Sequence, residues 1–190
     1  GYTFSGWNTA ANGSGSAYAD GAVYAFSADV TLFAQWNALP NHSVTFNNNG
    51  GTGTMTAQTT NVATALTLNT FTRAGYTFSG WNTAANGSGS TYADGAVYAF
   101  TADVTLFAQW SENEYTLTII SEHGTVIRDN NGPYHWNDVV TLTPTADTGW
   151  IFTHWTPNLT DDQITITGNM IVTANYIQNE RKLYLPLLIK

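Results

Sequence analysis

Hydrophobic and polar positions alternate along most of this chain. The run at residues 104–110 reads Val-Thr-Leu-Phe-Ala-Gln-Trp, and the runs at 115–120 and 172–176 alternate in the same way. A period of two places successive side chains on opposite faces of a β-strand. Thr, Val, Tyr, Phe and Trp dominate these runs, and these residue types suit a half-buried pleated surface. The pattern therefore predicts strands.

Turn signals lie between these runs. Asn-Gly stands at residues 12–13 and 86–87, and Asp-Gly stands at 20–21 and 94–95. Both dipeptides accept positive φ and so favour tight hairpin turns. No stretch of ten residues or more has a clean period of 3.6, and the best helix candidate is one or two turns over residues 61–70. We expect a mainly β protein built from small, twisted, mainly antiparallel sheets.

A long internal repeat organises the chain. Residues 1–36 and 75–110 are identical at 34 of 36 positions, and they differ only at Ala17/Thr91 and Ser27/Thr101. The offset between the two copies is too large for a solenoid rung and suits a small domain repeated in tandem. Residues 37–74 are then the first half of the repeat that ends at Trp110. Residues 1–36 have no such first half here, so either the array continues upstream or something else completes them.

A third, diverged copy follows. Four of its residues keep the spacing of four residues in the earlier copy: Gly149, Trp150, Phe152 and Trp155 stand where that copy has Gly75, Tyr76, Phe78 and Trp81. The closing Ala-Asn-Tyr at 174–176 echoes Ala-Gln-Trp at 108–110. The inner Trp and the closing aromatic are closer together in this sequence than in the earlier copy, so a loop has been shortened.

We therefore predict four segments. Residues 1–36 are the C-terminal half of a repeat (the first repeat half), residues 37–110 are a complete repeat (the second repeat), and residues 111–178 are a diverged repeat (the third repeat). Residues 179–190 form a hydrophobic tail. Such modules would act as beads on a string, each roughly 30 Å across for a compact domain of this size.

The repeated motifs resemble a known family. Val-Thr-Phe at 44–46, Asn-Gly-Gly at 49–51, Gly-Tyr-Thr-Phe-Ser-Gly-Trp at 75–81 and Leu-Phe-Ala-Gln-Trp at 106–110 resemble the Listeria–Bacteroides repeat, which is related to the B repeats of internalin-type proteins. Residues 115–176 resemble the divergent internalin B-repeat domain. The resemblance implies a β-grasp-like fold with at most one short helix. It also implies a place in secreted or surface-attached bacterial proteins, as stalk, adhesin or assembly modules, and it supplies no catalytic residues.

Aromatic residues recur at fixed positions in every copy. They could stack on sugars, but a small domain needs large side chains to fill its interior, so core packing is the favoured interpretation. The predicted core aromatics are Tyr2, Phe4, Trp7, Trp36, Tyr76, Phe78, Trp81, Trp110, Trp150, Phe152, Trp155 and Tyr176.

The acidic residues of the repeats are the first candidates for chemistry. The pairs Asp20/Asp94 and Asp29/Asp103 could be metal ligands or paired carboxylates, but Asp-Gly is a turn signal and an Asp before a strand commonly accepts a free backbone N–H. A weak calcium site in the third repeat is an alternative to a plain acidic loop face. Its candidate ligands are Glu112, Glu114, Asp161 and Asp162.

The other candidates fit known active-site patterns poorly. The Gly-rich stretches at 12–16, 47–53 and 86–90 lack the Lys-Ser/Thr of a phosphate loop. The four histidines show neither metal-ligand spacing nor a nucleophile–base pattern: His42, His123, His135 and His154. We predict no catalytic residue, no cofactor and no metal.

Composition and charge narrow the function classes. Only 9% of residues are charged, the net charge is −8, and there are five Lys and Arg residues, so nucleic acid and anionic lipid are poor partners. The 14% aromatic content indicates a folded chain. With no Cys there are no disulfides, and because no apolar run is long enough to cross a bilayer, no membrane span is expected. Residues 1–110 contain no Lys, which excludes Lys–Asn crosslinks inside them.

The tail is the most hydrophobic stretch of the chain. It is either a last strand that docks on the third repeat or an assembly strand that adds to an open sheet edge of a neighbouring molecule. Residues 1–36 would offer such an edge, and head-to-tail joining of this kind builds a filament. The residues of this assembly strand would be Leu183, Tyr184, Leu185, Leu187, Leu188 and Ile189.

These observations favour a non-enzymatic, extracellular structural module of a bacterial surface protein, acting as a stalk, spacer or filament subunit. Its partners would be neighbouring repeats or further copies of itself. The main alternative is an adhesin or binding module that recognises a glycan or a host protein through loops and exposed aromatics. A third class is an accessory segment of a larger enzyme.

Overall fold

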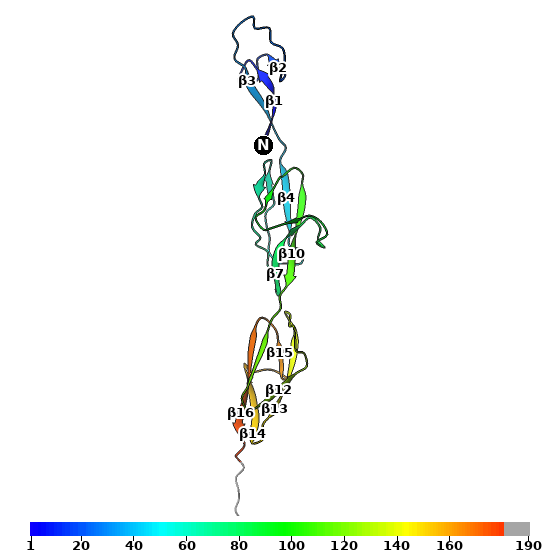
Figure 1. The fold of residues 1–190 in the computed structure, drawn as a ribbon, viewed down its shortest axis with the longest axis vertical. Helices are drawn as coiled ribbons and strands as arrows, with labels where there is room; N and C mark the ends of the chain where they lie inside the picture. Colours follow the sequence, from blue (N-terminus) through cyan, green and yellow to red (C-terminus); the bar gives the residue numbers. More distant parts are fainter. Residues whose placement is uncertain (181–190) are drawn as a thin grey trace, which may run out of the picture. The chain divides into compact units, whose positions relative to one another are not determined.

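The computed structural model of the chain describes residues 1–180, and its secondary structure consists of β-strands alone (Figure 1). This confirms the expected mainly β fold. The helix considered over residues 61–70 does not form; that stretch contains the short strand β6 (Thr64–Ala65), which pairs antiparallel with β9 (Val97–Tyr98). The predicted assembly strand at residues 183–189 lies outside the described residues.

The chain divides into two compact units. The first comprises Gly1–Phe71 and Ser79–Gln109, and the second comprises Thr72–Phe78 and the residues from Trp110 onward.

The first repeat half forms a three-stranded antiparallel sheet within the first compact unit. Its order is β2 (Ala17–Tyr18), β1 (Tyr2–Asn8) and β3 (Phe33–Ala38), so β3 is an edge strand. A bulge interrupts β1 between Phe4 and Gly6. Gly6 has φ +131°, and a Cβ there would lie 2.8 Å from the carbonyl oxygen of Tyr18, so both the backbone and the close approach require glycine.

The second repeat forms a five-stranded mixed sheet. Its order is β5 (Gln58–Thr60), β4 (His42–Asn47), β10 (Val104–Glu112), β7 (Tyr76–Asn82) and β8 (Thr91–Tyr92). The strands β4 and β10 run parallel, with Val104 opposite Val44 and Leu106 opposite Phe46. The first half of the repeat thus lies beside the strand that closes the second half. The buried hydrophobic residues of this repeat are Val44, Phe46, Leu66, Phe71, Trp81, Phe100, Leu106 and Ala108.

The third repeat, in the second compact unit, has two three-stranded sheets. One has the order β11 (Leu117–Ser121), β16 (Met170–Gln178) and β14 (Trp150–Thr156), and the other β12 (Gly124–Arg128), β13 (Val139–Ala146) and β15 (Gln163–Thr165). Here too the opening strand β11 runs parallel to the closing strand β16, and β14 carries a bulge between Phe152 and His154. The core between the strands consists of Leu117, Tyr134, Val140, Leu142, Trp155, Ile164, Ile166, Val172 and Ala174.

Candidate functional site

A tryptophan–aspartate hydrogen bond recurs in every copy. Trp7 Nε1 donates to Asp20 Oδ1 at 3.3 Å, and Trp81 Nε1 donates to Asp94 Oδ1 at 3.4 Å. A largely buried indole N–H needs such an acceptor, because leaving it unpaired costs free energy. Asp20 and Asp94, which belong to the Asp-Gly dipeptides, therefore accept an indole N–H in addition to favouring a turn. The sequence contained the signal, a constant spacing of 13 residues between Trp and Asp in both copies.

The third repeat keeps this bond although its loop is shorter. Trp155 Nε1 donates to Asp162 Oδ1 at 2.7 Å, across only seven residues. Asp162 and its neighbour Asp161 both have positive φ, 57° and 53°. Asp162, considered from sequence as a calcium ligand, thus accepts an indole N–H.

The Gly-rich loops are fixed by buried asparagines. Asn82 is fully buried; its Nδ2 donates to the carbonyls of Gly87 and Gly89 at 3.1 and 3.2 Å, and its Oδ1 accepts the N–H groups of Ala84 and Gly89 at 2.8 and 3.0 Å. Asn8 makes the same four bonds with its own loop. Four bonds exhaust the capacity of one amide side chain. These loops are therefore braced from within.

In the second repeat, Asp103 contacts residues of the first half of the repeat. Asp103 Oδ1 accepts the N–H of Ser43 at 2.8 Å and lies 3.5 Å from His42 Nδ1. Ser43 and His42 belong to β4, so this carboxylate fastens the start of β4 to the start of β10. Both Asp103 and its counterpart Asp29 are exposed to solvent.

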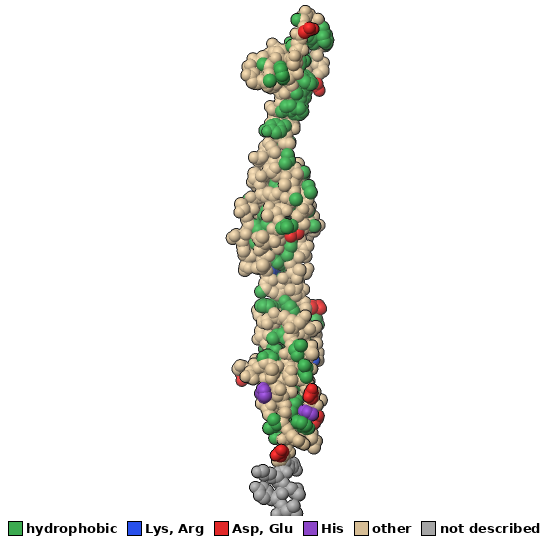
Figure 2. All heavy atoms as spheres, turned by 90° about the vertical axis from the view of Figure 1, so that its left-hand side faces the viewer, with side chains coloured by type: hydrophobic (Ala, Val, Ile, Leu, Met, Phe, Trp, Pro, Cys, Tyr) green, Lys and Arg blue, Asp and Glu red, His purple; other side chains and the backbone are tan. Residues whose placement is uncertain are grey.

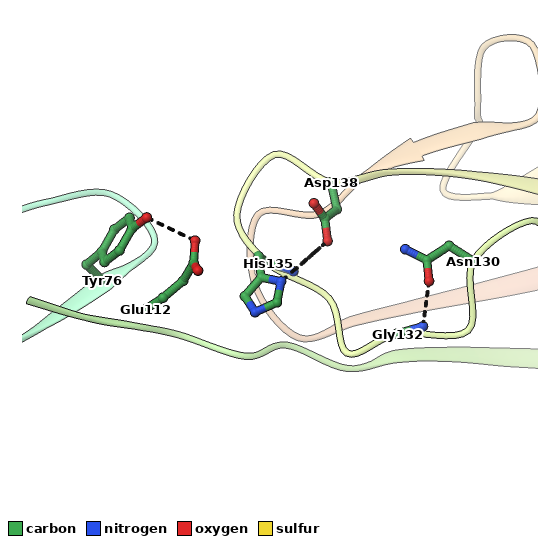
Figure 3. Close-up of polar contacts among 6 residues, drawn as sticks. All are labelled: Tyr76, Glu112, Asn130, Gly132, His135 and Asp138. Atoms are coloured by element: carbon green, nitrogen blue, oxygen red, sulfur yellow. Dashed lines mark hydrogen bonds and ion pairs between the residues drawn. The ribbon is translucent and has the colours of Figure 1, made fainter.

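The histidines lie apart from one another in separate local contacts. His123 stacks on Trp150, with ring centroids 3.4 Å apart and planes 5° apart. His135 lies beside Asp138, which accepts the His135 N–H at 2.7 Å (Figure 3). His154 Nδ1 lies 3.0 Å from Thr153 Oγ1. Within residues 1–180 there is no group of three or more His, Asp or Glu side chains that could hold a metal ion.

Figure 3 shows polar contacts at strand ends and in loops of the second compact unit. The hydroxyl of Tyr76 donates to Glu112 Oε1 at 2.9 Å (Figure 3). This bond to a carboxylate holds the proton on the phenol and raises the pKa of Tyr76 above its ordinary 10.0. The guanidinium of Arg73 covers the same ring, 3.8 Å from its centroid. Elsewhere in this unit, the Thr141 N–H donates to Asp129 Oδ1 at 3.0 Å and lowers the pKa of that carboxyl.

One backbone hydrogen bond closes each copy. Leu39 N–H donates to Gly1 O at 2.8 Å, Asn113 N–H to Gly75 O at 2.8 Å, and Asn179 N–H to Gly149 O at 2.7 Å. Within the first compact unit, Asn61 Nδ2 also donates to Gly1 O at 3.3 Å and to Leu39 O at 2.9 Å. The end of each copy is thus tied to the glycine at which its second half begins.

The third repeat contains a hollow of about 480 Å³. Its lining includes Glu114, Tyr115, Arg128 and Asn131. Tyr134 forms part of the wall: its hydroxyl donates to Asn130 O at 2.7 Å and accepts from Arg128 Nη1 at 3.4 Å. One cation, one carboxylate and two tyrosine rings thus line a single concave surface, which sequence reasoning missed because these residues come from different loops and strands.

The structure places the expected core aromatics at three depths. Trp81 and Trp155 are buried, and Tyr2 and Trp36 are exposed by 67% and 59%. The other eight are half-buried: Phe4, Trp7, Tyr76, Phe78, Trp110, Trp150, Phe152 and Tyr176. The two exposed rings, both in residues 1–36, depart from the expected core packing; their counterparts Tyr76 and Trp110 are half-buried in the second compact unit.

The same contrast is sharpest at two equivalent phenylalanines. Phe26 is 86% exposed and Phe100 is 2% exposed, although the sequences around them are nearly identical. Tyr18, Tyr24 and Phe26 keep edge-to-face contacts at 5.7 and 5.2 Å, close to the 5.4 and 5.3 Å of the corresponding rings in the second repeat. Figure 2 shows hydrophobic side chains gathered over the part of the chain that holds β1–β3. The local geometry is kept, but the apolar face is uncovered.

The repeated arrangement agrees with comparisons to known proteins. The family model described as the Listeria-Bacteroides repeat domain matches residues 1–35 and 42–109. The chain belongs to this family. The divergent InlB B-repeat domain matches residues 115–180, so the two resemblances seen in the sequence are confirmed, in the expected order. Repeat families of this kind are typical of bacterial surface proteins.

Two relatives of this Listeria-Bacteroides repeat chain come from Evansella cellulosilytica. A protein named "Putative Gly-rich membrane protein" is 33% identical over 198 residues, which cover 95% of this chain and 23% of the relative. A protein named "Putative membrane protein" is 32% identical over 134 residues, which cover 63% of this chain and 20% of the relative. The chain thus spans less than a quarter of the length of these curated relatives. No solved structure matches it. Within residues 1–180 the structure contains no helix that is long and apolar enough to cross a membrane.

Proposed function

We propose that these repeats form a non-enzymatic structural spacer in an extracellular protein of the bacterial cell surface. The observation that carries this proposal is the Trp–Asp hydrogen bond, which recurs in all three copies at 3.3, 3.4 and 2.7 Å. The same internal bond is kept even where the loop has shortened. Repetition of this Trp–Asp hydrogen bond supports a role in which each copy supplies length and rigidity.

The hydrogen bonds that the polar side chains make within the chain support the proposal that the repeats are non-enzymatic. Asp94 accepts both the Trp81 indole and the Asn69 N–H, the latter at 2.9 Å. Asp103 accepts the Ser43 N–H, and Asn82 is bonded to its own loop. General acid–base chemistry needs a titratable group that can reach a substrate. In these repeats the carboxylates of Asp94 and Asp103 already accept hydrogen bonds from other residues of the chain.

The extracellular location rests on the family and on the printed names of the relatives. The Listeria-Bacteroides and InlB-type repeats are typical of bacterial surface proteins, and both relatives are named as membrane proteins. A spacer in such a protein would hold another part of a longer polypeptide away from the cell.

The test is a change in the number of repeats. Duplicating residues 37–110 adds one complete repeat to the chain. We expect the maximum dimension measured by small-angle X-ray scattering to rise by roughly 30 Å, the size of a compact domain of this length. A second duplication should add the same amount again. An unchanged maximum dimension would contradict the spacer, because the repeats would then pack side by side.

A second candidate function is glycan binding in the hollow of the third repeat. Its volume of about 480 Å³ is in the range of small-ligand sites, and Arg128, Glu114 and Tyr115 offer charge, hydrogen bonds and an aromatic ring. Binding on a glycan array should be lost in Arg128→Ala and kept in the control Arg73→Ala, which removes a cation that covers Tyr76 instead. If the unchanged chain binds no glycan, or if Arg128→Ala retains binding, this second function is wrong.

A further inference from the structure

The opening and closing strands of the second repeat form a parallel pair. β4 and β10 are paired over four residues each, from Val44 opposite Val104 to Asn47 opposite Phe107. The chain therefore enters this ladder at one end, through β4, and leaves it at the other end, through β10. Tension along the chain then pulls the two strands past each other along their own axes. All hydrogen bonds of the ladder share this shear load, whereas two strands pulled apart at one end separate one bond at a time.

Side-chain hydrogen bonds extend this ladder at both ends. At its start, Asp103 Oδ1 accepts the Ser43 N–H at 2.8 Å. At its far end, Asn49 Nδ2 donates to Ala108 O at 2.9 Å. Both bonds join the β4 segment to the β10 segment, so they carry the same shear load as the backbone bonds. Val44, within the ladder, is fully buried, and this low-dielectric environment strengthens the backbone bonds beside it.

The diverged third repeat keeps the same arrangement. Its opening strand β11 and its closing strand β16 are parallel over five residues each, starting with Leu117 opposite Met170. Asn169 directly precedes β16, as Asp103 directly precedes β10, and its Oδ1 accepts the Thr116 N–H at 3.0 Å. The residue before the closing strand has changed from Asp to Asn, but its hydrogen bond to the opening segment is kept. A parallel ladder with a side-chain bond at its start is thus common to two repeats of different sequence.

We propose that each of these ladders is a mechanical clamp, and that the repeats bear tension between parts of a longer protein. One clamp is the pair β4–β10 with the bonds of Asp103 and Asn49, and the other is the pair β11–β16 with the bond of Asn169. This inference rests on the spacer function proposed above and adds the kind of load that the spacer carries. The chain has no Cys and residues 1–110 have no Lys, so neither a disulfide nor a Lys–Asn crosslink reinforces the second repeat. Its resistance to force has to come from non-covalent bonds.

The test applies force to the second repeat in two directions. Because the chain contains no Cys, two introduced cysteines define where the handles attach to the full chain of residues 1–190. Asn41→Cys with Ser111→Cys places the handles at opposite ends of the ladder and loads it in shear. Asn41→Cys with Ala102→Cys places both handles at its start and pulls the two strands apart from there. All three positions are exposed, so the substitutions leave the core intact.

The two directions should give different rupture forces in single-molecule force spectroscopy. At the same loading rate, we expect the force in shear to be at least about threefold higher, because four backbone pairs share the load. The comparison uses the same repeat with the same contacts, so only the direction of loading differs.

Variants of the side-chain bonds locate the clamp. Asp103→Ala combined with Asn49→Gly removes both bonds, and glycine keeps the positive φ of 47° at position 49. The shear force should fall by about a third, because two of the six links that share the load are lost. Asp94→Ala is the matched control, since it removes the acceptor of the Asn69 N–H outside the ladder. Forced unfolding follows the unfolding barrier and not the equilibrium stability, so Asp94→Ala should lower stability to urea but keep the shear force.

Two results would overturn the clamp. One is a rupture force in shear that is equal to, or lower than, the force for strands pulled apart at the ladder start. The other is an equal loss of shear force in Asp94→Ala and in the variant that lacks both side-chain bonds, because resistance would then follow overall stability. Either result leaves the length increment per duplicated repeat intact, so failure of this inference can be distinguished from failure of the spacer function.

Discussion

Trp155 and Asp162 are joined by a 2.7 Å hydrogen bond across seven residues, whereas Trp81 reaches its equivalent partner across 13. The loop between the two positions has lost residues, yet the bond has been kept. Trp155 is 3% exposed, so its N–H has little access to water when the carboxylate is absent. The pair therefore fixes the shortened loop to the core of the third repeat.

Removing this carboxylate should destabilise the third repeat. We compare Asp162→Gly with Asp161→Gly, because both positions have positive φ and glycine relieves the backbone equally in each. Asp162→Gly should lower the free energy of unfolding by about 1–3 kcal/mol, since the buried indole N–H loses its acceptor. Asp161→Gly should stay within about 0.5 kcal/mol of the unchanged chain. Urea unfolding followed by circular dichroism measures both, and equal effects would rule out the bond as the cause.

The loop after β7 should depend on the amide of Asn82. Asn82→Asp keeps the shape but replaces two N–H donors by an oxygen that faces the carbonyls of Gly87 and Gly89. We expect a loss of at least about 2 kcal/mol in unfolding free energy. Asn86→Asp is the control, because Asn86 uses only its oxygen, which accepts from Ser88. Thermal unfolding of the two variants should differ clearly, and matching midpoints would contradict the assigned role of Asn82.

The same substitution should have very different effects on stability in the two near-identical halves. Phe100→Ala empties a position that is 2% exposed and should reduce the unfolding free energy of the second repeat by about 3–5 kcal/mol. Phe26→Ala alters a position that is 86% exposed and should change stability by less than about 0.5 kcal/mol. Both residues have φ near +50°, so backbone strain cancels in the comparison. Similar losses in chemical denaturation would mean that residues 1–36 already bury Phe26.

The pKa of Tyr76 should respond to Glu112 and not to Glu114. Glu112→Gln removes the main cause of the raised pKa, so the phenol should titrate closer to 10.0, as followed by nuclear magnetic resonance of the Tyr76 ring. Because the folded-state pKa lies above the unfolded value, the Tyr76–Glu112 bond contributes stability below about pH 10 and loses it as the pH rises through the folded pKa. Glu114→Gln should leave the titration unchanged. A Tyr76 pKa that is insensitive to Glu112→Gln would exclude the bond in solution.

Strands and tight turns could be predicted from the sequence because their causes are local. Alternation at residues 104–110 lies in β10, and the repeated Asp-Gly and Asn-Gly dipeptides lie between strands. The family followed from motifs that are themselves short. Predicting these features requires only the local sequence and not the contacts between distant segments.

The pairings could not be predicted, because they depend on long-range contacts. A period of two gives the face of each residue but not the direction of the neighbouring strand, so the parallel pairs β4–β10 and β11–β16 were missed. Phe26 and Phe100 have nearly the same local sequence, yet they are 86% and 2% exposed, so their burial depends on residues far away in the sequence. The indole acceptors Asp94 and Asp162 were missed for a similar reason: their role depends on where a loop returns to the core.

Stretching single molecules tests the central claim most directly, because a spacer must consist of modules that fold and resist force one by one. Pulling the chain from its two ends should give two discrete unfolding steps, one for residues 37–110 and one for residues 111–178. Each step should release on the order of 200 Å of extended chain. Residues 1–36 should extend without a step of their own. A single step of about twice that length, or smooth extension without steps, would contradict the account.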